Sequence, residues 1–93
     1  MIYPFVELND GTNIVHSEAK IIDGKEQVKV YIEKPDAELG FRHATCWLPE
    51  YKWEDIYGFT EDEMEYLKKF VEDSASVIIK FARKGGFGSA ANF

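Results

Sequence analysis

The sequence predicts an α+β domain in which an antiparallel meander of about four strands is followed by one long C-terminal amphipathic helix. Extended segments separated by short turn signals fill residues 2–48, and consecutive strands joined by short turns pair antiparallel. From residue 60 onward, apolar residues recur at helical spacing behind a complete helix-start signal. A chain of 93 residues is long enough for one domain and not for two.

Four extended segments are expected in the first half. Residues 2–8 form the first, where Pro4 favours a sheet edge or a strand start. Residues 12–22 form the second, with an interruption near residues 16–18. Residues 26–34 alternate most clearly between apolar and polar positions, and residues 41–48 form the last strand before Pro49. Residues 49–59, which are dense in aromatic side chains, are expected to be a connector that packs over one end of the core.

The helix begins with a capping box, in which Thr60 is the N-cap and Glu63 stands three residues later. Gly85-Gly86 is expected to end it. A helix over residues 61–84 would be roughly 36 Å long, whereas a globule of this chain length is only about 30 Å across. We therefore expect either a break near Asp73-Ser74 or a protruding end. The domain is assigned to residues 1–84, and residues 85–93, rich in Gly, Ser and Ala, are expected to be a flexible tail.

The apolar arc of this helix is wider than one sheet face needs. Tyr66, Val77 and Ile79 extend it beyond the stripe that packs against a sheet. The excess is expected to contact the aromatic connector, the tail or a second subunit.

Charge and composition restrict the partners that the protein can have. The net charge is −6, and residues 50–65 alone carry seven acidic residues against Lys52. This balance disfavours nucleic acid, because phosphate binding depends on Lys and Arg, and it favours a basic partner. The plainer alternative is that these acids solvate a loop and the start of the helix. One cysteine, no secretory signal and no apolar run of membrane-spanning length lead us to expect a cytoplasmic protein without membrane contact, bacterial to judge from its size.

No catalytic, metal or cofactor site can be assembled from the sequence. His43 and Cys46 are three residues apart in a strand, so their side chains point to opposite faces and cannot form a dyad. The only other histidine is His16, and no metal-binding or phosphate-binding motif is present. We therefore predict no catalytic residues, no metal and no cofactor, and we lean against an enzyme without excluding one.

One surface is a candidate binding face. Phe41, His43, Thr45 and Trp47 share one side of the last predicted strand, and Tyr31 on the preceding strand could lie beside them. If this face is exposed, its aromatic side chains mark a binding site. The alternatives are that the helix covers this face, or that both faces of the sheet are covered.

Three segments carry a resemblance to a known family. They are the extended run 30–33, the strand 44–48 and the Gly58-Phe59-Thr60-x-x-Glu63 entry into a patterned helix. Between Val28 and Phe81 the chain resembles a family of small bacterial proteins of unknown function that are often encoded near toxin–antitoxin-like gene pairs. Members usually carry a histidine-containing motif where this chain has Val28-Lys29-Val30. The resemblance implies a compact sheet-plus-helix domain and brings no activity with it.

Two functions from different classes follow. The first is a regulatory or protein-interaction module that acts through the acidic segment, the aromatic face or the wide helix. The second is a small ligand-binding or enzymatic domain with a pocket near His43 and Trp47. The first is preferred because no acid–base or nucleophilic constellation can be assembled.

Overall fold

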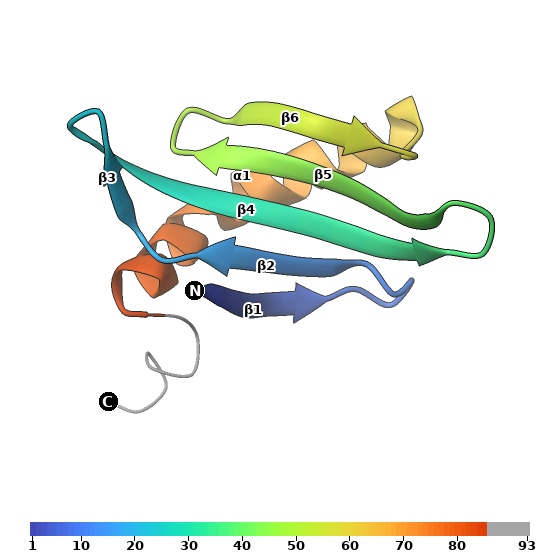
Figure 1. Ribbon diagram of the computed structural model, residues 1–93, viewed down its shortest axis with the longest axis horizontal. Helices are drawn as coiled ribbons and strands as arrows, with labels where there is room; N and C mark the ends of the chain where they lie inside the picture. Colours follow the sequence, from blue (N-terminus) through green and yellow to red (C-terminus); the bar gives the residue numbers. More distant parts are fainter. Residues whose placement is uncertain (86–93) are drawn as a thin grey trace.

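The computed structural model describes residues 1–85, in which one antiparallel sheet is covered on one face by a helix (Figure 1). The sheet has the order β1-β2-β4-β5-β6, and β3 pairs with β4. The strands and the helix are β1 (Ile2–Glu7), β2 (Asn13–Ser17), β3 (Lys20–Ile22), β4 (Lys25–Asp36), β5 (Gly40–Leu48), β6 (Lys52–Tyr57) and α1 (Glu61–Arg83). The predicted α+β meander with a C-terminal helix is confirmed, with six strands among these residues instead of about four.

One additional strand comes from a break in the second extended segment. β2 ends at Ser17 and β3 begins at Lys20, so the interruption falls at Glu18-Ala19. The Ala19 N–H donates to the carbonyl oxygen of Ala82 at 3.2 Å, which ties this break to the last turn of α1. β3 then forms a short hairpin with the start of β4.

The other additional strand corrects the expected connector. Within residues 49–59, β6 pairs antiparallel with β5 and forms one edge of the sheet. Its pairing shifts register between His43 and Thr45, opposite Asp55, which has a φ of 52°. A bulge of this kind inserts one residue and breaks the two-residue alternation that identifies a strand in a sequence. The physical reason for the wrong prediction is therefore local: β6 has no regular alternation to detect.

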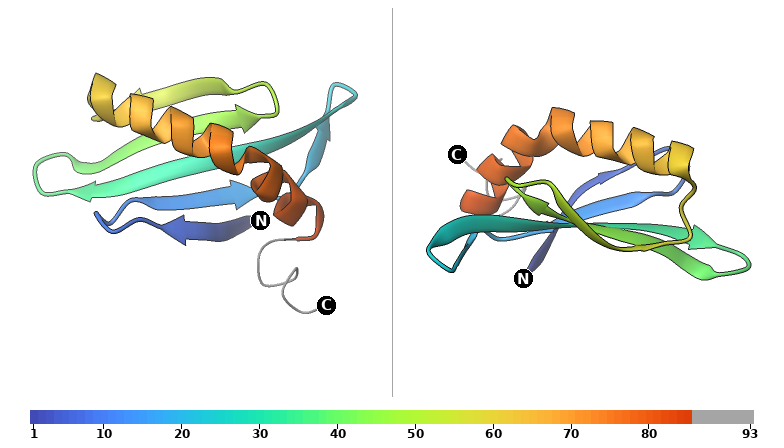
Figure 2. Two further views of the ribbon diagram at one scale, coloured as in Figure 1. Left: turned by 180° about the vertical axis from the view of Figure 1, so that it is seen from behind. Right: turned by 90° about the horizontal axis from the view of Figure 1, so that it is seen from above.

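The core lies between the sheet and α1. Alternate residues of β4 face the helix, and the register places Val28, Val30 and Ile32 opposite Leu48, Cys46 and Ala44 of β5. From α1, the buried residues are Met64, Leu67, Val71, Ala75, Ile78 and Ala82. Because Ala44, Cys46 and Leu48 lie in this core, the opposite face of β5 is the one that the helix leaves uncovered (Figure 2).

The helix start is confirmed in detail, and its expected break is wrong. The Thr60 side chain accepts from the Glu63 N–H, and the Glu63 side chain accepts from the Thr60 N–H. The helix continues through Asp73-Ser74 as one segment of 23 residues, which is about 34 Å at the usual rise. The longest axis of the described chain is 40 Å. An elongated sheet, with β4 crossing most of its length, accommodates the helix that a spherical globule would not (Figure 2).

Both ends of this helix are fixed to the sheet. At the C-terminal end, Arg83 Nε donates to both carboxylate oxygens of Glu26 at 3.0 Å. Lys84 is the C-cap and Gly85 follows at a φ of 81°, the left-handed conformation that glycine adopts most readily. The proposed tail beyond Gly85 lies outside the described residues.

The wide apolar arc of α1 leaves two large side chains on its outer side. Tyr66 is 59% exposed and Val77 is 42% exposed, whereas Ile79 is half-buried against the core. Of the three residues that widened the predicted arc, Ile79 alone therefore packs against the core of the described chain.

Candidate functional site

The uncovered face of the sheet carries all five side chains that the sequence singled out. Thr45 pairs with Tyr31 of β4, and His43 and Trp47 stand on either side of it along β5. Phe41 lies at the end of the same face, opposite Pro35, and is 50% exposed. We call this surface the open face. It consists of residues from β4, β5 and β6 whose side chains point away from α1.

An aromatic row crosses three strands of the open face. The rings of Tyr31 and His43 stack with centroids 6.4 Å apart and planes inclined by 20°. On the other side of His43, the Tyr57 ring stacks at 5.3 Å and 23°. Tyr57 comes from β6 and is 47% exposed. The sequence prediction missed it because residues 49–59 were assigned to a connector. The signal that could have found it is the pair of aromatic residues Trp53 and Tyr57 in a segment bounded by Pro49 and Gly58, typical of a strand.

The tautomer of His43 follows from its hydrogen bond. Its Nδ1 lies 2.9 Å from the carbonyl oxygen of Asp55. A carbonyl oxygen can only accept, so Nδ1 carries the proton. In the neutral ring, Nε2 is then left as an acceptor at the other edge.

One end of the open face is acidic. The Tyr31 hydroxyl donates to Glu33 Oε2 at 3.1 Å. Partial burial, and then the carboxylates of Glu33 and Asp55, raise the pKa of this hydroxyl. Tyr31 therefore stays protonated near neutral pH and acts as a hydrogen-bond donor between two carboxylates.

The opposite end of the open face carries two lysines around Trp47. The Lys29 ammonium lies 5.9 Å from the centre of the Trp47 ring, within the range of a cation–π contact. Lys52 is the register partner of Trp47 on β6. The indole N–H of Trp47 donates to Glu54, which lies opposite Thr45. Trp47 is thus held in one orientation by groups from both neighbouring strands.

Both outer strands of the sheet are irregular. β1 shifts register between Pro4 and Val6, and Pro4 has no N–H to donate. β6 is bulged near Asp55. Bulges and prolines at sheet edges hinder the addition of a further strand. A partner is therefore better accommodated by the open face than by either edge.

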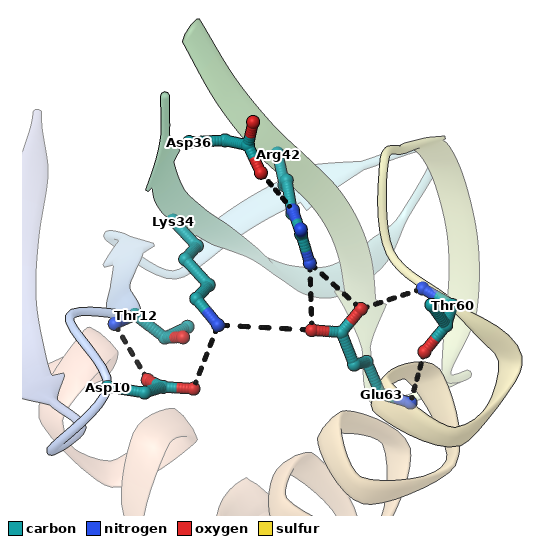
Figure 3. Close-up of polar contacts among 7 residues, drawn as sticks. All are labelled: Asp10, Thr12, Lys34, Asp36, Arg42, Thr60 and Glu63. Atoms are coloured by element: carbon teal, nitrogen blue, oxygen red, sulfur yellow. Dashed lines mark hydrogen bonds and ion pairs between the residues drawn. The ribbon is translucent and has the colours of Figure 1, made fainter. Parts of the chain in front are cut away.

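A polar network joins the first turn of α1 to β4, to β5 and to the loop that follows β1 (Figure 3). Arg42 Nη1 donates to both oxygens of Glu63 at 3.0 and 2.9 Å, and its Nε donates to Asp36 at 2.8 Å. The Lys34 ammonium lies between Glu63 at 3.9 Å and Asp10 at 3.4 Å. These contacts account for Glu63, Asp36 and Asp10 as partners of basic groups, and they give no carboxylate the raised pKa of a general acid.

Hydrogen bonding lowers the pKa of two carboxyls in this network. For Asp36, the N–H groups of Leu39 and Glu38 contribute most, followed by Arg42. For Glu63, the Thr60 N–H contributes most, and Arg42 and Lys34 add to it. A carboxyl with a lowered folded-state pKa stabilises the fold above its ordinary pKa, near pH 4, and this contribution is lost as pH falls through the lowered value.

The substitution Glu63→Gln should lower the free energy of unfolding by about 1 kcal/mol at pH 7, because the amide keeps the capping geometry but loses the charge that Arg42 binds. The difference from wild type should shrink as pH falls through the lowered pKa of Glu63, since its carboxylate is then protonated. Urea unfolding at pH 7 and pH 2.5 measures both values. Glu61→Gln is the matched control in the same helical turn, where no described side chain pairs with the carboxylate. Equal losses for both variants at pH 7 would argue against the role given to the network.

The network borders a small cavity at the start of the helix. The cavity has a volume of about 250 Å³. Its wall is formed by Leu8, Asp10, Thr12, Lys34, Phe59, Asp62, Glu63, Tyr66 and Leu67. Of its charged groups, Asp10, Lys34 and Glu63 are already paired in the network, and Asp62 is the remaining one. This set of side chains indicates no particular reaction.

Comparison with protein-family models, with curated proteins and with solved structures finds no match for this chain. The resemblance to the small bacterial family of unknown function stays a prediction. The function must therefore be argued from the geometry of the chain itself.

The remaining chemically reactive groups are separated by the sheet. His16 is fully buried on the helix side, where its Nδ1 donates to the carbonyl oxygen of Ser17 at 2.7 Å, whereas His43 lies on the open face. Cys46 is also buried on the helix side, and burial raises the pKa of its thiol to about 12. A thiol protonated at neutral pH is a poor nucleophile. Within residues 1–85 no group of three or more potential metal ligands lies close together, and no helix is long and apolar enough to span a membrane.

The expected pocket near His43 and Trp47 is found at Trp47 and not at His43. A cavity of about 380 Å³ is lined by Trp47, together with Ile22, Gln27, Glu50, Lys52 and Glu54. His43 is not among its lining residues. The histidine belongs to the aromatic row, on the other side of Thr45.

Proposed function

We propose that this protein is an interaction module that binds a protein partner through the open face of its sheet. The supporting observation is the aromatic row together with Trp47 and Phe41, which stand on the face that the helix leaves uncovered. Aromatic side chains are enriched where proteins bind one another, and an uncovered group of them marks an interaction surface. A cytoplasmic location, expected from the composition, is part of the proposal.

The charges around the row favour protein over nucleic acid as the partner. Glu33, Glu54 and Asp55 accompany the aromatic side chains, and Lys29 and Lys52 stand beside Trp47. Aromatic sheet faces that stack nucleic acid bases need a surrounding positive surface to hold the phosphates. The open face lacks that excess of positive charge.

A small-ligand function is the second candidate, and one observation favours it. The cavity beside Trp47 contains both an ammonium, from Lys52, and carboxylates, from Glu50 and Glu54. Such a set could hold a small polar molecule against the indole ring. Because His43 lies outside this cavity, its imidazole cannot act on a molecule held beside Trp47, so binding is favoured over catalysis here.

Site-specific photo-crosslinking tests the proposal. A photoreactive amino acid placed at Tyr57 on the open face should give covalent protein adducts in cells. The same group at Tyr66 should give none. The two positions are matched, because both are tyrosines with 47% and 59% exposure on opposite sides of the molecule. Adducts from Tyr66 alone, or from neither position, would contradict an interaction through the open face.

A further inference from the structure

We propose that the partner on the open face is a second copy of this chain, docked face to face about a two-fold axis that runs across the strands at Thr45. This inference rests on the proposed function and names its partner. It is argued from the arrangement of charge on the face, the symmetry that this arrangement permits and the area available.

The charges of the open face are separated along the strands. On β4, Lys29 is the register partner of Trp47 and Glu33 is the partner of His43, so the two charges lie on either side of Tyr31. On β6, Lys52 pairs with Trp47, while Asp55 gives its carbonyl oxygen to His43. On both flanking strands the lysine therefore lies at the Trp47 end and an acidic residue, Glu33 or Asp55, at the His43 end. Glu54, opposite Thr45, lies near the middle and accepts from the Trp47 indole.

Thr45 lies between these ends. It is 2% exposed and is flanked on one side by Tyr31 and on the other by Glu54, its partners on the adjacent strands. The small side chain leaves the larger aromatic groups on either side as the outermost parts of the face. With the axis at this position, Thr45 faces its own symmetry mate, and the Trp47 side chain of one copy meets the His43 side chain of the other on either side of it.

A two-fold axis across the strands at Thr45 makes these charges complementary. Such a rotation reverses the strand direction and keeps each strand over its own symmetry mate. Lys29 of one copy then faces Glu33 of the second copy, and Lys52 faces Asp55. A two-fold axis parallel to the strands would instead bring the two lysine ends together, and like charges that face each other weaken an interface. The charge pattern thus selects one of the two symmetric ways to pair the faces.

The area is sufficient for a stable dimer. A dimer about this axis would cover the open face together with the adjoining side of β1 and β2. These five strands and the nine residues of β5, at about 4.8 Å between strands and 3.3 Å per residue, give a surface of roughly 700 Å². Standard interfaces bury about 800 Å² per partner. Two sheets packed face to face would form a sandwich between the two helices, a common way to cover a sheet.

Sedimentation and light scattering of the unmodified protein are the first test. A dimer is expected at about 100 μM, because interfaces near the standard size bind with micromolar or tighter affinity, and it should dissociate on further dilution. A monomer throughout this range would overturn the inference without requiring any variant. If Tyr57 still crosslinks to a different protein in that case, the proposed function survives while the identity of the partner is wrong.

Charge reversal tests the symmetry. The double variant Lys29→Glu/Lys52→Glu makes both ends of the open face negative. The double variant Glu33→Lys/Asp55→Asn leaves the face positive. Asparagine is chosen at position 55 because it tolerates the left-handed backbone there. Each variant alone should dimerise at least about 30-fold more weakly than wild type. An equimolar mixture should regain the dimer, because the two faces are now complementary.

The control is Lys68→Glu/Lys69→Glu, on the exposed side of α1, which should dimerise like wild type. Circular dichroism establishes that each variant is folded. Folded variants that dimerise as well as wild type when alone, or that fail to pair when mixed, would overturn the proposed arrangement.

Discussion

Replacing Ile78 with alanine should lower the free energy of unfolding by about 3 kcal/mol, a large part of the 5–15 kcal/mol that stabilises a typical domain. Ile78 is fully buried where α1 packs against the sheet. The alanine would remove three carbon atoms from a core that the surrounding rigid sheet cannot fully close. Urea unfolding followed by circular dichroism measures the loss.

The neighbouring position supplies the control for this prediction. Val77 is 42% exposed on the outer side of the same helical turn. Val77→Ala should change the free energy of unfolding by less than about 0.5 kcal/mol, since it removes little buried area and alanine favours the helix. Similar losses at the two positions would mean that α1 does not pack on the sheet in the orientation described.

Replacing Gly58 with alanine should lower the free energy of unfolding by about 2–4 kcal/mol, for two reasons that add. Gly58 has a φ of 84°, which is costly for any residue with a Cβ atom. That Cβ would also lie 2.9 Å from Cγ of Arg42. Since the guanidinium of Arg42 is held by Asp36 and Glu63, its side chain cannot move without breaking those bonds. Thermal or urea unfolding of the variant measures the loss.

Gly40 isolates the contribution of the contact. Its φ is 83°, nearly that of Gly58, but an added Cβ would meet nothing within 4 Å. Gly40→Ala should therefore cost only about 1–2 kcal/mol. In an Arg42→Ala background the cost of Gly58→Ala should fall toward that of Gly40→Ala, which a double-mutant cycle would show. If Gly58→Ala lowers the free energy of unfolding no more than Gly40→Ala does in the wild-type background, the contact with Arg42 does not contribute to the cost.

The sequence predicts best where a residue's preference and its packing agree. The alternation at Val28, Val30 and Ile32 and the Thr60–Glu63 capping box are both present as expected. Each depends on residues close together in the chain. The helix continues through Asp73-Ser74 because the long sheet beneath it supplies apolar contacts on either side, and a size estimate for a sphere could not include that shape.

The candidate site is predictable only in part. The common face of Phe41, His43, Thr45 and Trp47 follows from strand alternation, and Tyr31 follows from the pairing of neighbouring strands. Tyr57 and the charges of β6 depend on a bulged edge strand that leaves no regular pattern. The choice of which face the helix covers is decided by the packing of Cys46 and Leu48, a tertiary contact that alternation alone cannot assign.

The position of α1 after all six strands also affects how the chain can fold during synthesis. Every strand is complete by Tyr57, but within residues 1–85 the apolar side of the sheet packs mainly against the helix that follows. A nascent chain that has emerged as far as β6 would therefore present an unprotected apolar surface until α1 leaves the ribosome. Such exposed intermediates are the ones most prone to aggregate and to be bound by chaperones. The capping box at Thr60 allows α1 to form its first turn as soon as it emerges, which would shorten that interval.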